Sequence, residues 1–287
     1  MRTTSGLGYG LKLPYFITLG QNRDLTLTPY ISTKGGRTLA ARYRQAFRTG
    51  TVQLDGALSF DRLLPGKRRG YILATGAFTL PRDFKLKFQL ETVSDAAYLL
   101  DYGLEPKDRL DSRVELTRAR RNEYISARQI QFQSIRAGES TATLPSVVTD
   151  RTFHRRFSGG PLGGEAGLRF QTHSHYRSSS SPLDADLDGH ADGRDLGRLS
   201  LRLDWRRNWV LPAGIIGSVL TEGTADIYDI RQDAIYQGKT TRLDGAAAVE
   251  LRWPWVGAGK NGASHVIEPV AQLVISPKTT PALPNED

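Results

Sequence analysis

The chain has 287 residues, no cysteine, a net charge of +9 and a mean hydropathy of −0.40. Without cysteine it forms no disulfide, thiolate zinc site or cysteine nucleophile. No run approaches the roughly 18 to 20 uncharged apolar residues of a transmembrane helix. A transmembrane β-barrel stays open, because its strands alternate lipid-facing and lumen-facing residues and are only mildly hydrophobic on average.

Apolar and polar residues alternate with a period of two from end to end, so each segment has one apolar and one charged face. Turns rich in glycine, asparagine or aspartate separate these segments. We predict about a dozen strands of roughly 8 to 12 residues, many joined as hairpins. The clearest segments are 25–32, 52–61, 84–91, 199–206 and 247–253.

Two stretches break the alternation. Residues 94–108 are predicted to carry a short helical turn, and 177–195 a hydrophilic loop. The second half of that loop has the oxygen spacing of a calcium site, with its carboxylates at Asp184, Asp186, Asp188, Asp192 and Asp195. Its last position is not the usual glutamate and its flanks are strand-like, which favours a solvated extracellular loop without calcium. No other metal site is predicted.

Two architectures fit the strands, a soluble sandwich and an outer-membrane barrel. Long strands, densely charged polar faces and aromatic residues near strand ends favour the barrel. The predicted fold class is therefore all-β, an antiparallel transmembrane β-barrel. Thirty of the 39 basic residues are arginine, which indicates phosphate-rich partners such as nucleic acid or anionic lipid, although a solvated basic surface explains the charge equally well.

The opening hairpin LPYFITLGQNRDLTLTPY (13–30) resembles the start of the barrel domain of the LptD family, the lipopolysaccharide-assembly proteins also known as the organic solvent tolerance family. Further blocks resemble the same family at 35–44, 144–148, 204–207, 265–269 and 283–287. The resemblance implies that residues 1–287 are a partial barrel, the first half of a larger outer-membrane barrel. The family's N-terminal jellyroll and the second half of the barrel would then be absent, and the signal peptide missing from this fragment.

The resemblance also implies a function without an enzymatic step or a cofactor. Family members receive lipopolysaccharide from a periplasmic bridge of LptA-like jellyrolls and pass its acyl chains through a lateral opening between first and last strands. The sugars traverse the lumen to the cell surface. The implied partners are lipopolysaccharide, outer-membrane lipids, the jellyroll bridge and an LptE-like plug lipoprotein, whose requirement the sequence leaves open. The implied location is the cell outer membrane, as an integral protein.

Two prolines of the opening hairpin are candidate functional residues. Proline cannot donate a hydrogen bond to a β-ladder, and in the family prolines at the positions of Pro14 and Pro29 weaken the seam beside the lateral gate. The alternative is that Pro14 merely begins a strand and that Pro29 sits at a bulge.

The charged faces of the strands are predicted to line a hydrated lumen. Their mixed signs suit a conduit for a phosphorylated oligosaccharide better than tight phosphate capture. The predicted residues are Arg42, Arg44, Asp55, Lys85, Lys87, Glu91, Arg202, Asp204, Arg206, Glu250 and Arg252.

Catalytic motifs are weak. The five histidines are scattered, and neither a nucleophile elbow nor a Walker loop is present. Two other functions stay open: an outer-membrane barrel enzyme acting on lipid A or phospholipid, and a soluble basic β-protein binding nucleic acid. We expect no enzymatic activity, no catalytic residue and no nucleic-acid partner.

Overall fold

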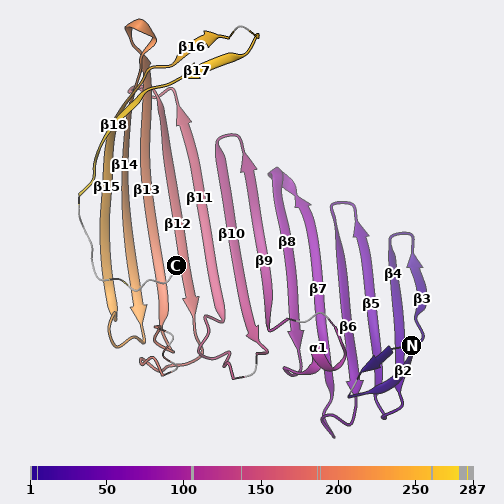
Figure 1. The fold of residues 1–287 in the computed structure, drawn as a ribbon. Coiled ribbons are helices and arrows are strands. Elements are labelled where there is room, and N and C mark those ends of the chain that lie inside the picture. The colour runs from indigo at the N-terminus through magenta and orange to yellow at the C-terminus, as the bar shows by residue number, and fades with distance from the viewer. Residues whose placement is uncertain are drawn as a thin grey trace.

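The computed structural model describes residues 2–4, 6–104, 107–136, 138–185, 187, 189–259, 261–277 and 283. Within them the chain is almost entirely antiparallel β-structure (Figure 1). None of the helices found in these residues has the length and apolar character to cross a membrane. The strands are β1 (Arg2–Thr4), β2 (Gly8–Lys12), β3 (Tyr15–Gly20), β4 (Arg23–Ser32), β5 (Arg37–Phe47), β6 (Gly50–Phe60), β7 (Arg69–Leu80), β8 (Phe84–Val93), β9 (Arg109–Arg120), β10 (Glu123–Ser134), β11 (Val147–Ser158), β12 (Glu165–Tyr176), β13 (Asp195–Val210), β14 (Ile216–Arg231), β15 (Gly238–Arg252), β16 (Trp255–Ala258), β17 (Ser264–Ile267) and β18 (Val270–Ile275).

The strands form one large sheet and one small hairpin. From β4 to β15 each strand pairs with its neighbour in the chain, and β18 pairs with β15 at the far end. At the near end, β2 and β3 both pair with β4. The hairpin β16–β17 projects away from the sheet between β15 and β18 (Figure 1). Local hairpins therefore build nearly the whole fold.

The all-β, antiparallel prediction is confirmed. The five clearest predicted segments correspond to β4, β6, β8, β13 and β15, and two of them extend one residue beyond the strand, at Asp61 and Trp253. The described sheet has 16 strands, more than the dozen expected, because short strands such as β1 and β2 carry too few residues to show an alternation. The predicted helical turn is α1 (Tyr98–Asp101).

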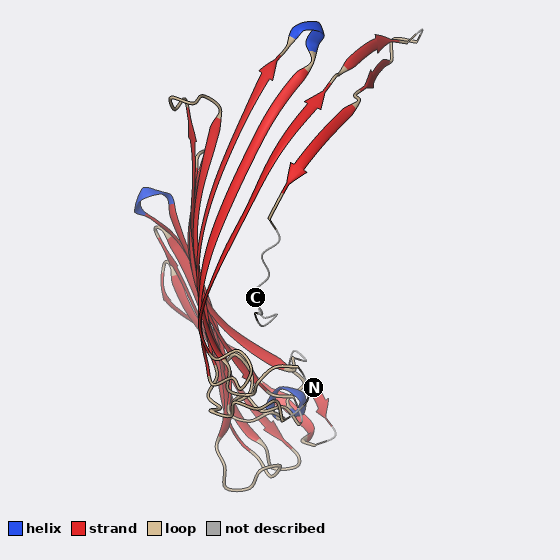
Figure 2. Cartoon of the chain, turned by 90° about the vertical axis from the view of Figure 1, so that its left-hand side faces the viewer, coloured by secondary structure: helices blue, strands red, loops and turns tan. Residues whose placement is uncertain are grey.

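The two ends of the sheet differ in the length of their connections. At one end, which we call the short-turn end, two-residue turns join β3 to β4, β5 to β6 and β9 to β10. At the opposite, long-loop end, the connections include 61–68, 94–108, 135–146 and 177–194. Figure 2 shows that the sheet is bowed and that α1 and the long loops gather on its concave side.

A buried arginine fixes α1 to the concave face. Arg69, at the start of β7, is 1% exposed and its guanidinium forms ion pairs with Asp61 (3.1 Å), Asp95 (2.7 Å) and Asp101 (2.8 Å). The rings of Tyr98 and Tyr102 lie against the same guanidinium. Three carboxylates from two loops thus compensate one buried cation, which otherwise would carry a large desolvation cost.

An apolar cluster surrounds this ionic centre. It joins α1 to the first strands of the sheet and to the loops beside it, and consists of Leu7, Tyr30, Val93, Tyr98, Leu99, Tyr102, Leu110 and Ile135. A smaller cluster at the same end consists of Leu196 of β13 with Tyr228 and Ile230 of β14. The core of the molecule therefore sits at the long-loop end, where loops cover the sheet.

Acid is predicted to release α1 from the sheet. Hydrogen bonds from Arg69 hold the pKa of the Asp95 carboxyl below its usual range, so this interaction stabilises docking fully above the unfolded pKa of about 3.9. It is lost as pH falls through the lower pKa of the folded state. Fluorine NMR of fluorotyrosine-labelled Tyr98 should show α1 still docked near pH 4 and becoming mobile as the pH falls further, through the lowered pKa of Asp95.

The variant Asp95→Asn supplies the control for this titration. It lacks the titrating carboxyl, so its Tyr98 signal should already be partly mobile at neutral pH and should respond less to acid. An Asp95→Asn titration identical to that of the unaltered chain would contradict the role of this ion pair.

Candidate functional site

Every predicted lumen charge lies on one face of the sheet. In an antiparallel pair, residues directly opposite each other point to the same side. The register runs from Arg42 to Asp55, Leu73 and Glu91 across four strands. The same register continues through all strand pairs to β15 and places the whole predicted set on one face. This is the concave face, which α1 covers at the long-loop end (Figure 2).

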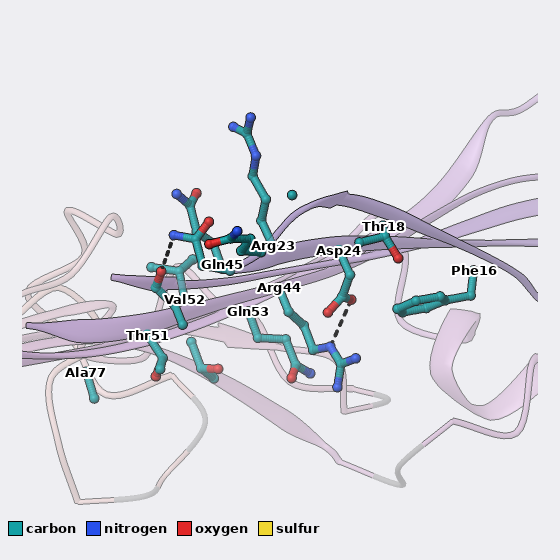
Figure 3. A pocket seen from close by; sticks show the side chains of 16 residues that line it. Phe16, Thr18, Arg23, Asp24, Arg44, Gln45, Thr51, Val52, Gln53 and Ala77 are labelled. Atoms are coloured by element: carbon teal, nitrogen blue, oxygen red, sulfur yellow. Dashed lines mark hydrogen bonds and ion pairs between the residues drawn. The ribbon is translucent and has the colours of Figure 1, made fainter. Parts of the chain in front are cut away.

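Ion pairs between strands, within a strand and to a loop organise the concave charges. Arg44 binds Asp24 at 3.0 Å, and Arg42 binds Asp55 at 2.5 Å. Figure 3 shows the first pair, and both of its residues line a hollow of about 730 Å³. The other predicted residues with ion-pair partners are Asp204 with Arg156, Arg202 with Glu222, Glu91 with Lys107, and Arg252 with Glu250.

Two further hollows lie on the same face. One is lined by Arg156, Arg202, Asp204, Arg206 and Glu222, and the other by residues of β9 to β13 that include Arg128, Asp150 and His173. Because cations and anions alternate along these walls, a charged solute would meet many weak sites and no single deep one. The arrangement suits passage of a polar solute more than its retention.

The opposite, convex face is largely apolar. The row through Leu25, Tyr43, Leu54, Ala74 and Leu90 crosses five strands without a charge. Many of its larger aliphatic side chains are not covered by other parts of the described chain: Leu203 is 54% exposed and Leu243 is 64% exposed. So extensive an exposed apolar face is unstable in water and is typical of a surface that meets lipid or another protein.

Face polarity changes toward the long-loop end of β10 to β15. There the convex row consists of Gln129, Thr149, Ser174, Gly197, Asp229 and Lys239. The concave side of the same region carries buried Leu196, Tyr228 and Ile230. The strands therefore extend beyond the apolar band, and this part of the sheet has the polarity of a soluble domain, with loops covering its core.

The first seam of the sheet, between β2–β3 and β4, is interrupted at both prolines. Pro14 lies between β2 and β3, directly before the first residue of β3, and Pro29 lies inside β4. The pairs Lys12–Tyr30 and Tyr15–Leu27 set one continuous register across the gap, so the bulge alternative for Pro29 is wrong. The N–H of Leu13 donates to the carbonyl of Pro29 at 3.2 Å.

The two prolines remove donors on different sides. In an antiparallel strand the N–H and C=O of one residue point to the same neighbour, and the next residue points away. Because the Pro29 carbonyl faces Leu13, its nitrogen also faces this seam and leaves the Leu13 carbonyl without a ladder donor. The nitrogen of Pro14 faces away from β4, toward the open edge of the sheet.

Side chains hold the seam on the long-loop side of this gap. The ring of Tyr30 lies so close over Gly10 that a Cβ atom there would come within 2.0 Å of it. Lys12 lies over the same ring. The seam is therefore fastened near α1 and weak beside Pro29.

Sequence reasoning missed the partners that come from neighbouring strands. His173 shares an edge contact with His175, and its Nδ1 lies 2.6 Å from a carboxylate oxygen of Asp150 in β11. The cluster around Arg69 was also missed, because Asp61 comes from one loop and Asp95 and Asp101 come from another. The break in alternation at 94–108 was the only signal for it.

The predicted calcium loop is described in part. Asp186 and Asp188 lie outside the described residues. Asp195 accepts a hydrogen bond from the N–H of Arg177, and Asp184 accepts one from the N–H of Gly189. Within the described ranges, no group of three or more histidine, aspartate or glutamate residues could hold a metal ion, and the calcium hypothesis stays a prediction.

A single bowed antiparallel sheet with a charged concave face and an apolar convex face is the class of structure that forms the wall of a barrel. A family model described as "LptD: LPS transport system D" matches residues 67–287, and the chain belongs to this family. Over 114 residues, 39% of its length, the chain is 23% identical to the LPS-assembly protein LptD of Idiomarina loihiensis. It spans 15% of that relative's length. The first seam, with Pro14 and Pro29, lies outside the range of the family match.

Restoring the missing donor is predicted to strengthen the first seam. Pro29→Ala supplies an N–H facing Leu13, and one added ladder hydrogen bond stabilises the pairing by about 0.5 to 1.5 kcal/mol. Exchange of the Tyr15 and Ile17 amides, measured by hydrogen-exchange mass spectrometry, should slow by about twofold to tenfold. Pro14→Ala is the matched control, because its new N–H faces the open edge. Equal slowing in both variants would contradict the assignment.

Proposed function

We propose that this chain forms part of the wall of an outer-membrane barrel that carries lipopolysaccharide to the cell surface. The observation that carries the proposal is the division of the sheet into an ionic concave face and an apolar convex face, together with membership of the LptD family. In a bilayer the convex face meets acyl chains and the concave face encloses water. Residues 1–287 then make up one portion of a larger barrel.

The concave residues act on the sugar and phosphate part of the cargo. Paired charges such as Arg42–Asp55 and Arg202–Glu222 keep the wall hydrated. Their side chains form short-lived hydrogen bonds with the hydroxyl and phosphate groups of a passing oligosaccharide. No bond is made or broken in this process, so no catalytic residue is required. The driving force comes from outside the chain, in the family's case from lipopolysaccharide delivered by a periplasmic bridge of jellyrolls.

The first seam acts as the part of the wall that opens sideways. The gap at Pro29 lowers the cost of parting β3 from β4, and Pro14 removes a donor from the edge that a closing strand would need. Acyl chains then leave the lumen for the bilayer through this opening. A plug lipoprotein inside the lumen is a further partner of this arrangement, and it would contact the concave face.

Photocrosslinking of newly made lipopolysaccharide tests this function. A photoreactive amino acid at Gln53, on the concave face, should capture pulse-labelled lipopolysaccharide transiently, with adducts that rise in the pulse and fall in the chase. The same group at Leu54, the next residue and on the convex face, should show no such transient. Transient capture at Leu54 with none at Gln53 would contradict the assignment of the faces.

A further inference from the structure

The apolar band of the convex face narrows sharply at β10 and β11. On β13 the band includes Leu199, Leu201, Leu203 and Trp205 in succession. On β11 the same face is not continuously apolar, because Arg151 and Arg155 lie on either side of Phe153. Across from Arg151 lie Ala127 and Thr172, both small. Both arginines are exposed, and across from Arg155 lie Glu123 and Leu168.

These two arginines differ from the others nearby because they form no ion pair. Arg118 binds Glu123, and Arg120 binds Asp83 at 2.9 Å. In the described part of the chain, Arg151 has neither an ion pair nor a hydrogen bond, and Arg155 makes only a contact with the ring of Phe157, 5.4 Å from its centroid. Both guanidinium groups thus keep all their donors available to a ligand.

The register places both arginines at the height of the apolar band. Arg151 lies in the row of Thr172 and Leu199, and Arg155 lies in the row of Leu168 and Leu203. Four residues of strand span about 13 Å, whereas the apolar band of an outer-membrane sheet is about 25 Å tall. The two side chains cannot lie on opposite sides of the band. An arginine at the bilayer midplane is strongly destabilising and one at headgroup level nearly neutral, so this segment must lie where phosphates reach it.

We propose that Arg151 and Arg155 form a binding site for the phosphate headgroup of an anionic membrane lipid on the outer wall of the sheet. The planar guanidinium binds a phosphate through two parallel hydrogen bonds. The Phe157 ring supports Arg155, and the small side chains beside Arg151 leave room for the lipid. Phe153 packs against the acyl chains between them. This inference rests on the proposed function, because it requires the convex face to meet lipid.

Lipid quenching of a probe between the two arginines tests the site. The chain has no cysteine, so Phe153→Cys can carry a single fluorophore. The full chain is purified with the chains that accompany it and reconstituted in phosphatidylcholine vesicles containing brominated phosphatidylglycerol or brominated phosphatidylcholine. Each interfacial arginine contributes about a fivefold preference for anionic lipid, so the two together contribute about 25-fold. Brominated phosphatidylglycerol should therefore quench at an about 25-fold lower mole fraction.

Two variants and one competitor decide the outcome. The double variant Arg151→Gln, Arg155→Gln should lower the ratio of quenching by the anionic lipid to quenching by phosphatidylcholine to about one. Arg231→Gln, which removes an exposed arginine at the long-loop end of β14, should leave it unchanged. Inorganic phosphate should not compete; full competition would assign the site to a soluble phosphate and overturn the lipid assignment. Equal quenching by both lipids in the unaltered chain would overturn the inference alone, whereas no quenching by either would overturn the proposed function as well.

Discussion

Strand register is the constraint on which the structure depends. Side chains alternate between faces with a period of two, so a slip of one residue between any two strands would move charges to the apolar side. From β4 to β15 the pairing runs without a register shift. Backbone hydrogen bonds thereby keep every ionic residue of the predicted set on one side, and the same bonds satisfy the polar backbone where no water is present.

Charge is treated differently in three parts of the sheet. On the concave face, cross-strand pairs such as Arg44–Asp24 stay accessible to water. At the long-loop end, Arg69 is buried and is stabilised by three carboxylates. On the convex face of β11, Arg151 and Arg155 have no ion-pair partner within the described residues. The first arrangement suits transit, the second fixes a loop, and the third requires a ligand from outside.

In the proposed opening of the first seam, the weak part and the fastened part lie on opposite sides of one gap. Tyr30 lies over Gly10 next to the apolar cluster that includes α1, while Pro29 lies one residue away and breaks the ladder. Motion of β3 would therefore pivot about the fastened side. The Arg69 cluster strengthens that side through Tyr98 and Tyr102, so the docking of α1 and the seam are mechanically connected.

The sequence predicted what depends on local alternation. The strands around Leu54, Leu86 and Leu201 and the common face of Arg42 and Glu250 follow from a period of two. Contacts between separate loops could not be predicted in this way, and neither the Arg69 cluster nor the His173–Asp150 pair has a spacing that reveals it. The position of Pro29 opposite Leu13 required the register, because sequence spacing alone does not say which strand faces a proline.

Accessibility along one strand tests the two-faced wall most directly. Spin labels placed singly from position 199 to 206 of β13, in the membrane-embedded protein, would report contact with oxygen, which concentrates in lipid, and with a water-soluble nickel complex. The account predicts two period-two profiles in opposite phase, with oxygen maxima at Leu199, Leu201, Leu203 and Trp205. Profiles in the same phase, or without a period of two, would contradict it.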